Sequence, residues 1–339
     1  MDRTRSPLDR LSDDVVLCLF SRAPFTTHGK LQAVCRRLRT LVRSREFLQQ
    51  RVDSGLAEYG LVVAGGARGG EPLAECSMLS SERQRLITPL LGPRECACSA
   101  VVEDEDGQPE MWVMGGWSRG GVVATVEAYN PRTNTWRSCP PLSQRRAAAA
   151  AGVVGGRLVV AGGSAIGADA FTSVEAYTPT GWTPLPPLPH AADGATACVL
   201  NGRLYVMGGI FCNKLQVLEM SEENEFTWRV KADLPEECCG AVSCVFEGSQ
   251  LLLIGGSSIG IFPTTTVSIY DPASDSWAAG PELPHPRRYT AITHEGQVRL
   301  LPDSAAFPAL AYRDGAWLAI GGIPGVPAFG ATCQSVILG

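Results

Sequence analysis

No stretch of the 339-residue sequence contains about 18 consecutive uncharged apolar residues, the length that a transmembrane helix needs. The N-terminal segment MDRTRSPLDRLSDD is charged and lacks the apolar core of a secretory signal peptide. We therefore expect a protein of the cytoplasm, the nucleus or both, with no membrane partner.

Motifs that carry chemistry are also scarce. The twelve cysteines lie scattered in apolar segments, without a C-x-x-C pair or zinc-type Cys/His spacing, so we interpret them as buried reduced thiols. The sequence contains neither a phosphate-binding P-loop nor a nucleophile elbow. Beyond residue 60 the only histidines are His190, His285 and His294. We therefore expect no metal, no cofactor and no catalytic centre.

The charge is unevenly distributed along the chain. The formal net charge is −5, yet residues 1–60 carry an excess of basic residues and the rest an excess of acidic residues. From Leu8 to Arg51 the apolar residues recur at helical spacing, and Ser12 stands at an N-cap position before Asp13 and Asp14. This pattern predicts a helical head over residues 1–55, containing three short helices, and a second module with different partners.

A repeat of short strands begins near Leu56. Glycine pairs start at positions 65, 115, 162, 208 and 255, and this regular spacing is typical of stacked four-stranded units. Each full repeat continues with a tyrosine-like position, a Trp, a proline-rich turn and a strand of small residues, as in VEAYNPRTNTW (126–136). Large aromatic residues between neighbouring units and small residues near a narrow axis favour an all-β propeller over residues 56–339.

The phase of the repeat predicts six blades. WLAIGG (317–322) looks like a sixth glycine-pair strand, but its phase places Trp317 at the tryptophan position and Tyr312 at the tyrosine position. The sixth glycine-pair strand is then the altered VRLLPDS (298–304). We expect the strand near 330–338 to join the blade that starts near 61–66 and close the ring. The first unit is degraded, with Leu86 at its Trp position.

Each of the two predicted modules resembles a known protein family. The repeat resembles the kelch motif, and LDRLSDDVVLCLFSRAPFTTHGKLQAVCRRLRTLVRSREFLQQR (8–51) resembles the F-box of plant F-box/kelch proteins. Ser12 and Leu38 depart from the Pro and Trp that are usual there. The resemblance implies a substrate receptor of a Skp/cullin/F-box ubiquitin ligase, in which the head binds a Skp-type adaptor and the propeller binds a protein target for ubiquitination and proteasomal degradation. The implied adaptor-binding residues are Leu8, Leu11, Val15, Leu19, Leu31, Val34, Cys35, Arg36, Leu38 and Leu41.

The resemblance also implies a target-binding rim, formed by loops after the glycine pairs and loops before the small-residue strands. Its arginines would suit an acidic or phosphate-bearing segment, although all these residues could instead be solvent-facing loop polars. The arginine cluster 36–45 could steer the adaptor, face solvent or contact nucleic acid; the last is disfavoured because no aromatics accompany it. The implied rim residues are Arg68, Arg94, Trp117, Arg119, Arg145, Arg146, His190, Phe211, Glu236, Glu237, Arg287, Arg288 and Tyr289.

Other functions of kelch rings fit the sequence less well. A copper oxidase needs gathered His ligands and an iron-dependent protein needs clustered carboxylates, whereas EDEDGQPE (103–110) is better interpreted as a solvated hairpin tip. A cytoskeletal or actin-type scaffold is the stronger alternative, but it gives no reason for the F-box-like head.

Overall fold

The computed structural model describes residues 8, 11–23, 25–54, 56, 59–79, 84–105, 107–166, 169–258, 262–283, 291–292, 309–313, 316–320 and 332–337. Within these ranges no helix has the length and apolar character needed to cross a bilayer. The same residues contain no group of three or more His, Cys, Asp or Glu side chains placed to hold a metal ion.

The described part of the head contains four helices, one more than the sequence predicts. The additional helix results from a break at Cys35, whose backbone is extended and whose thiol accepts a hydrogen bond from Leu38 N. Ser44 caps the last helix by accepting from Phe47 N, whereas the side chain of Ser12 makes no capping hydrogen bond. The helices are α1 (Asp13–Phe20), α2 (Phe25–Val34), α3 (Arg36–Val42) and α4 (Arg45–Asp53).

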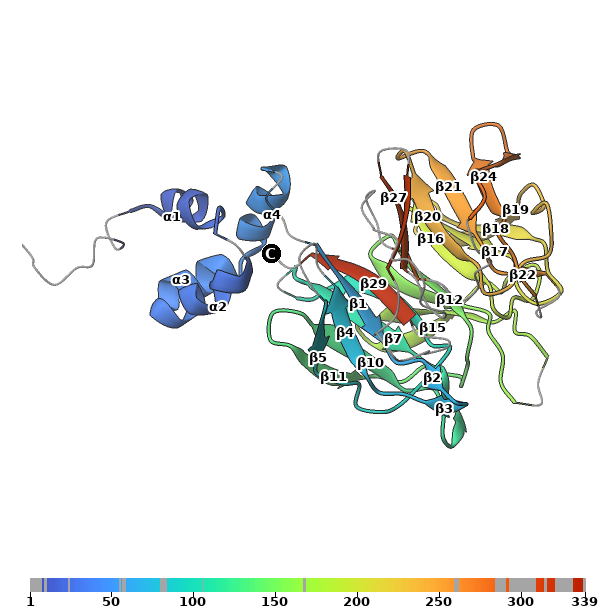
Figure 1. The fold of residues 1–339 in the computed structure, drawn as a ribbon, viewed down its shortest axis with the longest axis horizontal. Helices are drawn as coiled ribbons and strands as arrows, with labels where there is room; N and C mark the ends of the chain where they lie inside the picture. The colour runs from blue at the N-terminus through green and yellow to red at the C-terminus, as the bar shows by residue number, and fades with distance from the viewer. Residues whose placement is uncertain are drawn as a thin grey trace, which may run out of the picture.

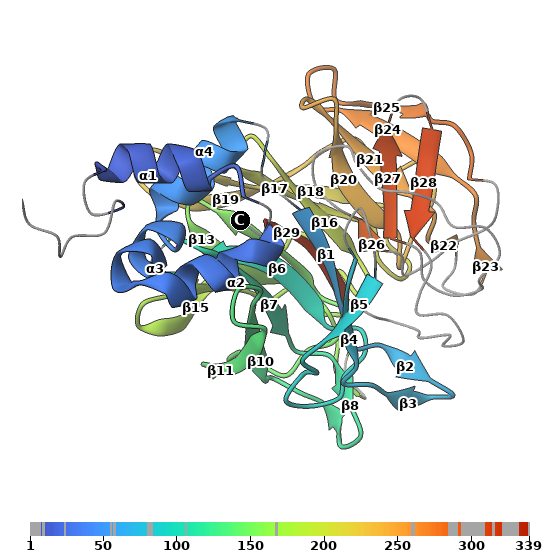
Figure 2. The ribbon, with the colours of Figure 1, turned by 60° about the vertical axis from the view of Figure 1, so that its left-hand side comes forward.

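The remainder is built from antiparallel sheets, which Figures 1 and 2 show gathered beside the helical head. Apolar side chains of adjacent sheets form the core. Five sheets have four strands, in the spatial orders β29 (Thr332–Ile337)–β1 (Tyr59–Ala64)–β4 (Cys76–Leu79)–β5 (Gln84–Ile87), β6 (Cys98–Glu103)–β7 (Pro109–Met114)–β10 (Val126–Asn130)–β11 (Thr135–Cys139), β12 (Ala150–Val154)–β13 (Arg157–Ala161)–β14 (Val174–Thr178)–β15 (Gly181–Leu185), β16 (Thr196–Leu200)–β17 (Arg203–Met207)–β18 (Leu215–Met220)–β19 (Phe226–Val230), and β20 (Val242–Phe246)–β21 (Gln250–Ile254)–β24 (Val267–Asp271)–β25 (Ser276–Ala279).

A further sheet has three described strands, β26 (Ala291–Ile292), β27 (Ala309–Arg313) and β28 (Ala316–Ile320), with β26 parallel to β27. The predicted glycine-pair strand at 298–304 lies outside the described residues. β29 pairs antiparallel with β1. The structure thus has a propeller architecture with five four-stranded sheets, while the count of six blades and the closure of the ring stay predictions.

Short hairpins follow three of the glycine pairs. Each consists of two strands of two residues. They are β2 (Ala67–Arg68) with β3 (Glu71–Pro72), β8 (Trp117–Ser118) with β9 (Gly121–Val122), and β22 (Ser257–Ser258) with β23 (Phe262–Pro263).

The aromatic positions of the repeat pair across their sheets as the phase predicts. In three of the four-stranded sheets a Tyr of the third strand stands opposite the Trp of the fourth, and Tyr312 pairs with Trp317 in the same way. Trp317 therefore stands opposite a tyrosine, as the fourth-strand tryptophans of those three sheets do. In the first sheet, however, Leu86 pairs with Ser77 and is 72% exposed, and Gln84 stands opposite Leu79. The prediction that Leu86 occupies the Trp position is wrong, because the strand register places Gln84 there.

The tryptophans also link neighbouring sheets through hydrogen bonds. In four sheets the indole Nε1 of the fourth-strand Trp donates to a backbone carbonyl in the proline-rich segment that leaves the preceding sheet, so the ring fills the gap and its polar atom is satisfied. The pairs are Trp136 with Thr88 O at 2.8 Å, Trp182 with Pro140 O at 2.9 Å, Trp228 with Pro186 O at 2.9 Å, and Trp277 with Ala232 O at 3.0 Å.

A second series of hydrogen bonds runs from sheet to sheet through the backbone. Ala148 N donates to Cys96 O at 2.7 Å, Gly194 N to Ala148 O at 2.9 Å, and Gly240 N to Gly194 O at 2.8 Å. All four residues have positive φ, with +49° at Cys96 and +52° at Ala148. Because L-residues rarely adopt this conformation, its repetition indicates that the inter-sheet hydrogen bonds fix the backbone here.

The head contacts the end of the propeller opposite the glycine-pair turns. Arg132, in the β10–β11 turn, donates to Val42 O at 2.7 Å, and Arg45 lies 3.7 Å from the Glu103 carboxylate at the start of the β6–β7 hairpin. That hairpin is therefore not a free solvated tip, as the sequence suggested. Figure 1 shows the helices on one side of the sheets and the β2–β3 hairpin far from them.

Candidate functional site

At the glycine-pair end, two arginines predicted for the rim point into the protein. Arg94 Nη1 donates to Gly115 O at 3.1 Å and Thr125 O at 2.9 Å, and Nη2 donates to Thr125 Oγ1 and to the Glu127 carboxylate. Burial lowers the pKa of Arg94, and the adjacent Glu127 acts in the opposite direction. The second Glu127 oxygen accepts from Leu91 N at 2.7 Å, so the carboxylate also holds the loop.

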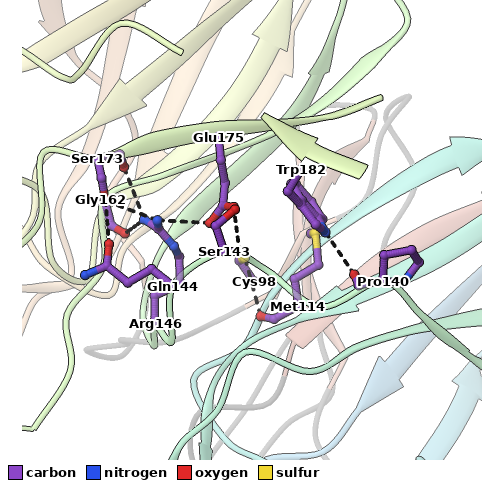
Figure 3. Close-up of polar contacts among 10 residues, drawn as sticks. All are labelled: Cys98, Met114, Pro140, Ser143, Gln144, Arg146, Gly162, Ser173, Glu175 and Trp182. Atoms are coloured by element: carbon purple, nitrogen blue, oxygen red, sulfur yellow. Dashed lines mark hydrogen bonds and ion pairs between the residues drawn. The ribbon is translucent and has the colours of Figure 1, made fainter. Parts of the chain in front are cut away.

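Arg146 makes the same set of contacts one sheet further along (Figure 3). Its Nη1 donates to Gly162 O at 2.6 Å and Ser173 O at 3.1 Å, and its Nη2 donates to Ser173 Oγ at 3.1 Å and Glu175 at 3.0 Å. Glu175 in turn accepts from Ser143 N at 2.8 Å. A planar guanidinium can donate several N–H groups at once to this set of carbonyl, hydroxyl and carboxylate oxygens.

These contacts correct the rim assignment for both residues. Arg94 is 3% and Arg146 2% exposed, because each is enclosed by the turn and strand of its own sheet. Neither guanidinium is available to a partner in this structure, and both instead hold a loop against its sheet.

The other predicted rim residues divide into three groups. Arg119, Arg145, His190, Phe211, Glu236 and Glu237 are exposed, Arg68 and Trp117 are half-buried, and Arg287, Arg288 and Tyr289 lie outside the described residues. Arg68 lies 3.0 Å from Glu75, and Arg119 lies 3.6 Å from Glu71. Among the described rim residues two arginines are buried and two lie beside acids, so this part of the end is less basic than the sequence suggested.

Two carboxylates that sequence reasoning missed also belong to this end. Glu95 directly follows Arg94, and Asp193 occupies the corresponding place two sheets further on; burial raises the pKa of both groups. Beside Asp193, whose carbonyl accepts from Ile210 N, Phe211 is 73% exposed. The sequence feature that could have identified Glu95 and Asp193 is their position directly after the arginine site of the repeat.

On the head, some predicted adaptor-binding side chains are exposed and others are internal. Val15, Leu19 and Val34 are 43%, 56% and 63% exposed, whereas Leu38 is buried at 2%. Cys35 and Arg36 are exposed, and the half-buried members are Leu8, Leu11, Leu31 and Leu41.

The arginine cluster of the head is partly engaged within the chain. Arg37 donates to Leu8 O and Leu11 O, both at 2.6 Å, and to the Asp13 carboxylate. Arg43 Nε donates to Gln32 Oε1 at 3.0 Å. These contacts stabilise the helix arrangement and reduce the charge that is free to act on a partner.

The fold and this arrangement define a kelch β-propeller with an N-terminal helical F-box. A Kelch motif model matches residues 108–143 and an F-box domain model matches residues 8–50. The chain is an F-box plus kelch-repeat protein, related to plant F-box/kelch-repeat proteins at about 30% identity.

Individual relatives match parts of the chain. One F-box/kelch-repeat protein of Arabidopsis thaliana is 31% identical over 180 residues, which is 50% of this chain and 45% of the relative. A second from the same plant is 27% identical over 163 residues, or 47% of this chain and 44% of the relative. The alignments thus span a little under half of each relative. The solved structure of YjhT has a TM-score of 0.58 at 15% identity, over 81% of this chain and 92% of that chain, which supports the fold alone.

Proposed function

We propose that this chain is the substrate-recognition subunit of a Skp/cullin/F-box ubiquitin ligase, acting in the cytoplasm or nucleus as a non-catalytic adaptor. The exposed apolar side chains Val15, Leu19 and Val34 carry the proposal, because they lie within the F-box match and at helices far from the glycine-pair loops. Val15 and Leu19 lie one turn apart on α1, and exposed apolar side chains close together on a small helical unit favour a protein partner. That partner would be a Skp-type adaptor.

The propeller supplies the other half of the proposed function. Residues 56–339 would form six blades, closed by the β29–β1 pairing, on the head of residues 1–55. The loops of the glycine-pair end would bind the protein target, which would then be presented away from the adaptor. The pairing of β29 with β1 and the location of the head at the opposite end support this arrangement.

Co-purification of the full chain with a Skp-type adaptor tests the adaptor half. We expect the native chain to retain the adaptor and Leu19→Asp to lose at least tenfold in affinity, since a charge would be buried at an apolar contact. Val52→Asp is the matched control, because Val52 is also partly exposed but lies on α4, outside the proposed surface. If the native chain does not bind, or if both variants bind equally well, the receptor proposal is wrong.

A further inference from the structure

The sheet β20–β21–β24–β25 contains the arginine site of the repeat without its arginine. Backbone hydrogen bonds define the equivalence: Gly66 N donates to Arg94 O and Gly116 N to Arg146 O, and Gly209 N donates to Cys238 O at 2.8 Å. Cys238 therefore occupies the place that Arg94 and Arg146 occupy in their own sheets.

The hydrogen-bond acceptors of that site are still in place. Gly255 N donates to Thr266 O, as Gly115 N does to Thr125 O and Gly162 N to Ser173 O. Gly255 O and the carbonyl and hydroxyl of Thr266 thus correspond to the groups that receive the Arg94 and Arg146 guanidinium groups. The thiol of Cys238 reaches one of them, Gly255 O, at 3.3 Å. A thiol cannot donate to the remaining acceptors as a guanidinium does.

Three residues of the arginine site have changed together. The Arg is replaced by Cys238 and the Glu by Ser268. In the other two sheets a loop residue, Leu91 or Ser143, binds the Glu through its backbone N–H. Here that loop residue is Pro235, which has no N–H. Both members of the internal ion pair are therefore absent, and the main-chain acceptors have no arginine side chain of the same chain beside them.

A cavity of about 60 Å³ lies at this place, lined by Pro235, Glu236, Glu237, Gly255, Thr266 and Ser268, among others. One water needs about 10–15 Å³ on the same measure, so the cavity has room for a group of four heavy atoms such as a guanidinium. The corresponding place in the sheet β16–β19, where Ala192 replaces Arg, is occupied differently. There the Gln216 amide, which is fully buried, bonds to the backbone N and O of His190 at 2.8 and 3.0 Å.

The charge at the mouth of the cavity favours a cation. Glu236 and Glu237 are both exposed and both line the cavity. Burial raises the pKa of the Cys238 thiol to about 12, so the thiol is neutral at physiological pH. Carbonyl oxygens inside and carboxylates at the opening are complementary to a guanidinium, which forms several directed hydrogen bonds where an ammonium acts as a point charge.

We propose that this cavity binds the side chain of an arginine presented by a partner protein, in the geometry that Arg94 and Arg146 adopt from within the chain. That the partner is the ubiquitylation target rests on the proposed function; arginine binding itself does not. The preference of this part of the rim is thus for a basic segment, opposite to the acidic segment that the arginine count suggested.

The direct test is a titration of the full chain, labelled with ¹⁵N-cysteine, with N-acetyl-L-arginine methylamide, followed by NMR. We expect a saturable shift of the Cys238 amide signal, identified by its loss in Cys238→Ser, with the exposed Cys35 as internal reference. N-acetyl-L-citrulline methylamide has nearly the same shape without the charge, and we expect it to require at least tenfold higher concentration. An unchanged Cys238 signal, or equal shifts with both probes, would overturn the proposal.

A second variant checks the geometry without any ligand. Cys238→Arg combined with Ser268→Glu restores the internal pair, and we expect a higher melting temperature. The amide signal of the adjacent Cys239, which should shift with that of Cys238 in the native chain, should not respond to the arginine probe in this variant. A lower melting temperature would contradict the claim that the cavity can hold a guanidinium. Because neither measurement involves the adaptor, failure here leaves the adaptor-binding test unaffected.

Discussion

At the scale of single residues, the two buried Arg–Glu pairs hold loops at the glycine-pair end against their sheets. Arg146 is 2% exposed and its carboxylate partner Glu175 is almost as buried, so each charge depends on the other. Buried ion pairs add little net stability over an apolar pair, but removal of one partner leaves an uncompensated charge. This asymmetry makes the pair a clear target for mutation.

We predict that Glu175→Ala lowers the free energy of unfolding by about 3–5 kcal/mol. Arg229→Ala, which removes the mostly exposed partner of Glu219 at 3.3 Å, is the control and should cost at most about 1 kcal/mol. Urea titration of the full chain, followed by tryptophan fluorescence, measures both. Equal losses would mean that the burial of Arg146 does not make it dependent on Glu175.

The buried cysteines predict a loss of stability at alkaline pH. Burial raises the pKa of Cys98 from 9.0 to about 12. In the unfolded chain this thiol ionises near pH 9, so its contribution is present below pH 9 and is lost as the pH rises toward 12.

We expect Cys98→Ala, the residue found at the equivalent Ala150, to reduce this pH dependence. Between pH 8 and pH 10.5 the native chain should lose on the order of 2 kcal/mol more free energy of unfolding than the variant, because one pKa unit corresponds to about 1.4 kcal/mol. Urea titrations at both pH values, in reducing agent, measure the difference. Parallel losses in the two proteins would contradict the prediction.

At the scale of strands and turns, the glycine pairs allow two backbones to approach closely. A Cβ at Gly162 would lie 2.3 Å from Ala192 O, and its φ is +68°. Gly156, in the β12–β13 turn, has nearly the same φ of +72°, but no described atom lies within 4 Å of its Cβ position. The two glycines therefore separate the effect of crowding from the effect of backbone conformation.

Substitution of each glycine by Ala should show this difference. Both variants bear the cost of a left-handed L-residue, about 1–2 kcal/mol, and Gly162→Ala should lose about 1–3 kcal/mol more because the backbone must shift. Thermal unfolding monitored by circular dichroism ranks the two. If the variants are equally stable, the close approach at Gly162 has no energetic importance.

The sequence predicts the strands and turns of the repeat correctly where the structure requires one particular type of residue. The glycine pairs and the Tyr–Trp pairs recur because close backbone approach and large inter-sheet gaps each require a particular size of residue. Leu86 misled the assignment, since an apolar residue in a degraded repeat does not fix the strand register. The sequence does not indicate the break at Cys35, because apolar residues continue at helical spacing across it.

The site was less predictable than the fold. Loop arginines look alike in sequence, and only the paired Glu on a strand of the sheet that follows distinguishes the buried Arg94 and Arg146 from the exposed Arg145. The relation is visible once the repeats are aligned by structure: the acid lies on the third strand of the same sheet, about 30 residues later. Exposure of the head residues Val15 and Leu19 likewise depends on how four helices pack.

At the scale of the whole molecule, the contact between head and propeller determines how the two modules are oriented. Burial, together with the nearby Arg43, lowers the pKa of Arg132 to about 10, so it is still charged at neutral pH when it donates to Val42 O. A hydrogen bond from a charged group contributes about 1.5–3 kcal/mol. Its loss should weaken the attachment of the head.

We predict that Arg132→Ala increases amide hydrogen exchange in residues 36–53 by about tenfold or more, which corresponds to about 1.4 kcal/mol. Arg203→Ala, which removes a half-exposed partner of Glu219 on the propeller, serves as the control and should leave the head unchanged. Exchange followed by mass spectrometry reports both. An unaltered head in Arg132→Ala would indicate that other contacts hold the two modules together.

The location of the head at the end of the propeller away from the glycine-pair turns has a thermodynamic consequence. Ligands at the two ends would share no contacting residue, and the sheets between them are fixed by inter-sheet hydrogen bonds. Binding at one end would then change the affinity at the other only through a coupling free energy that such a rigid connection keeps near zero. The binding free energies of two partners would therefore add, and occupancy at each end would follow the concentration of its own partner alone.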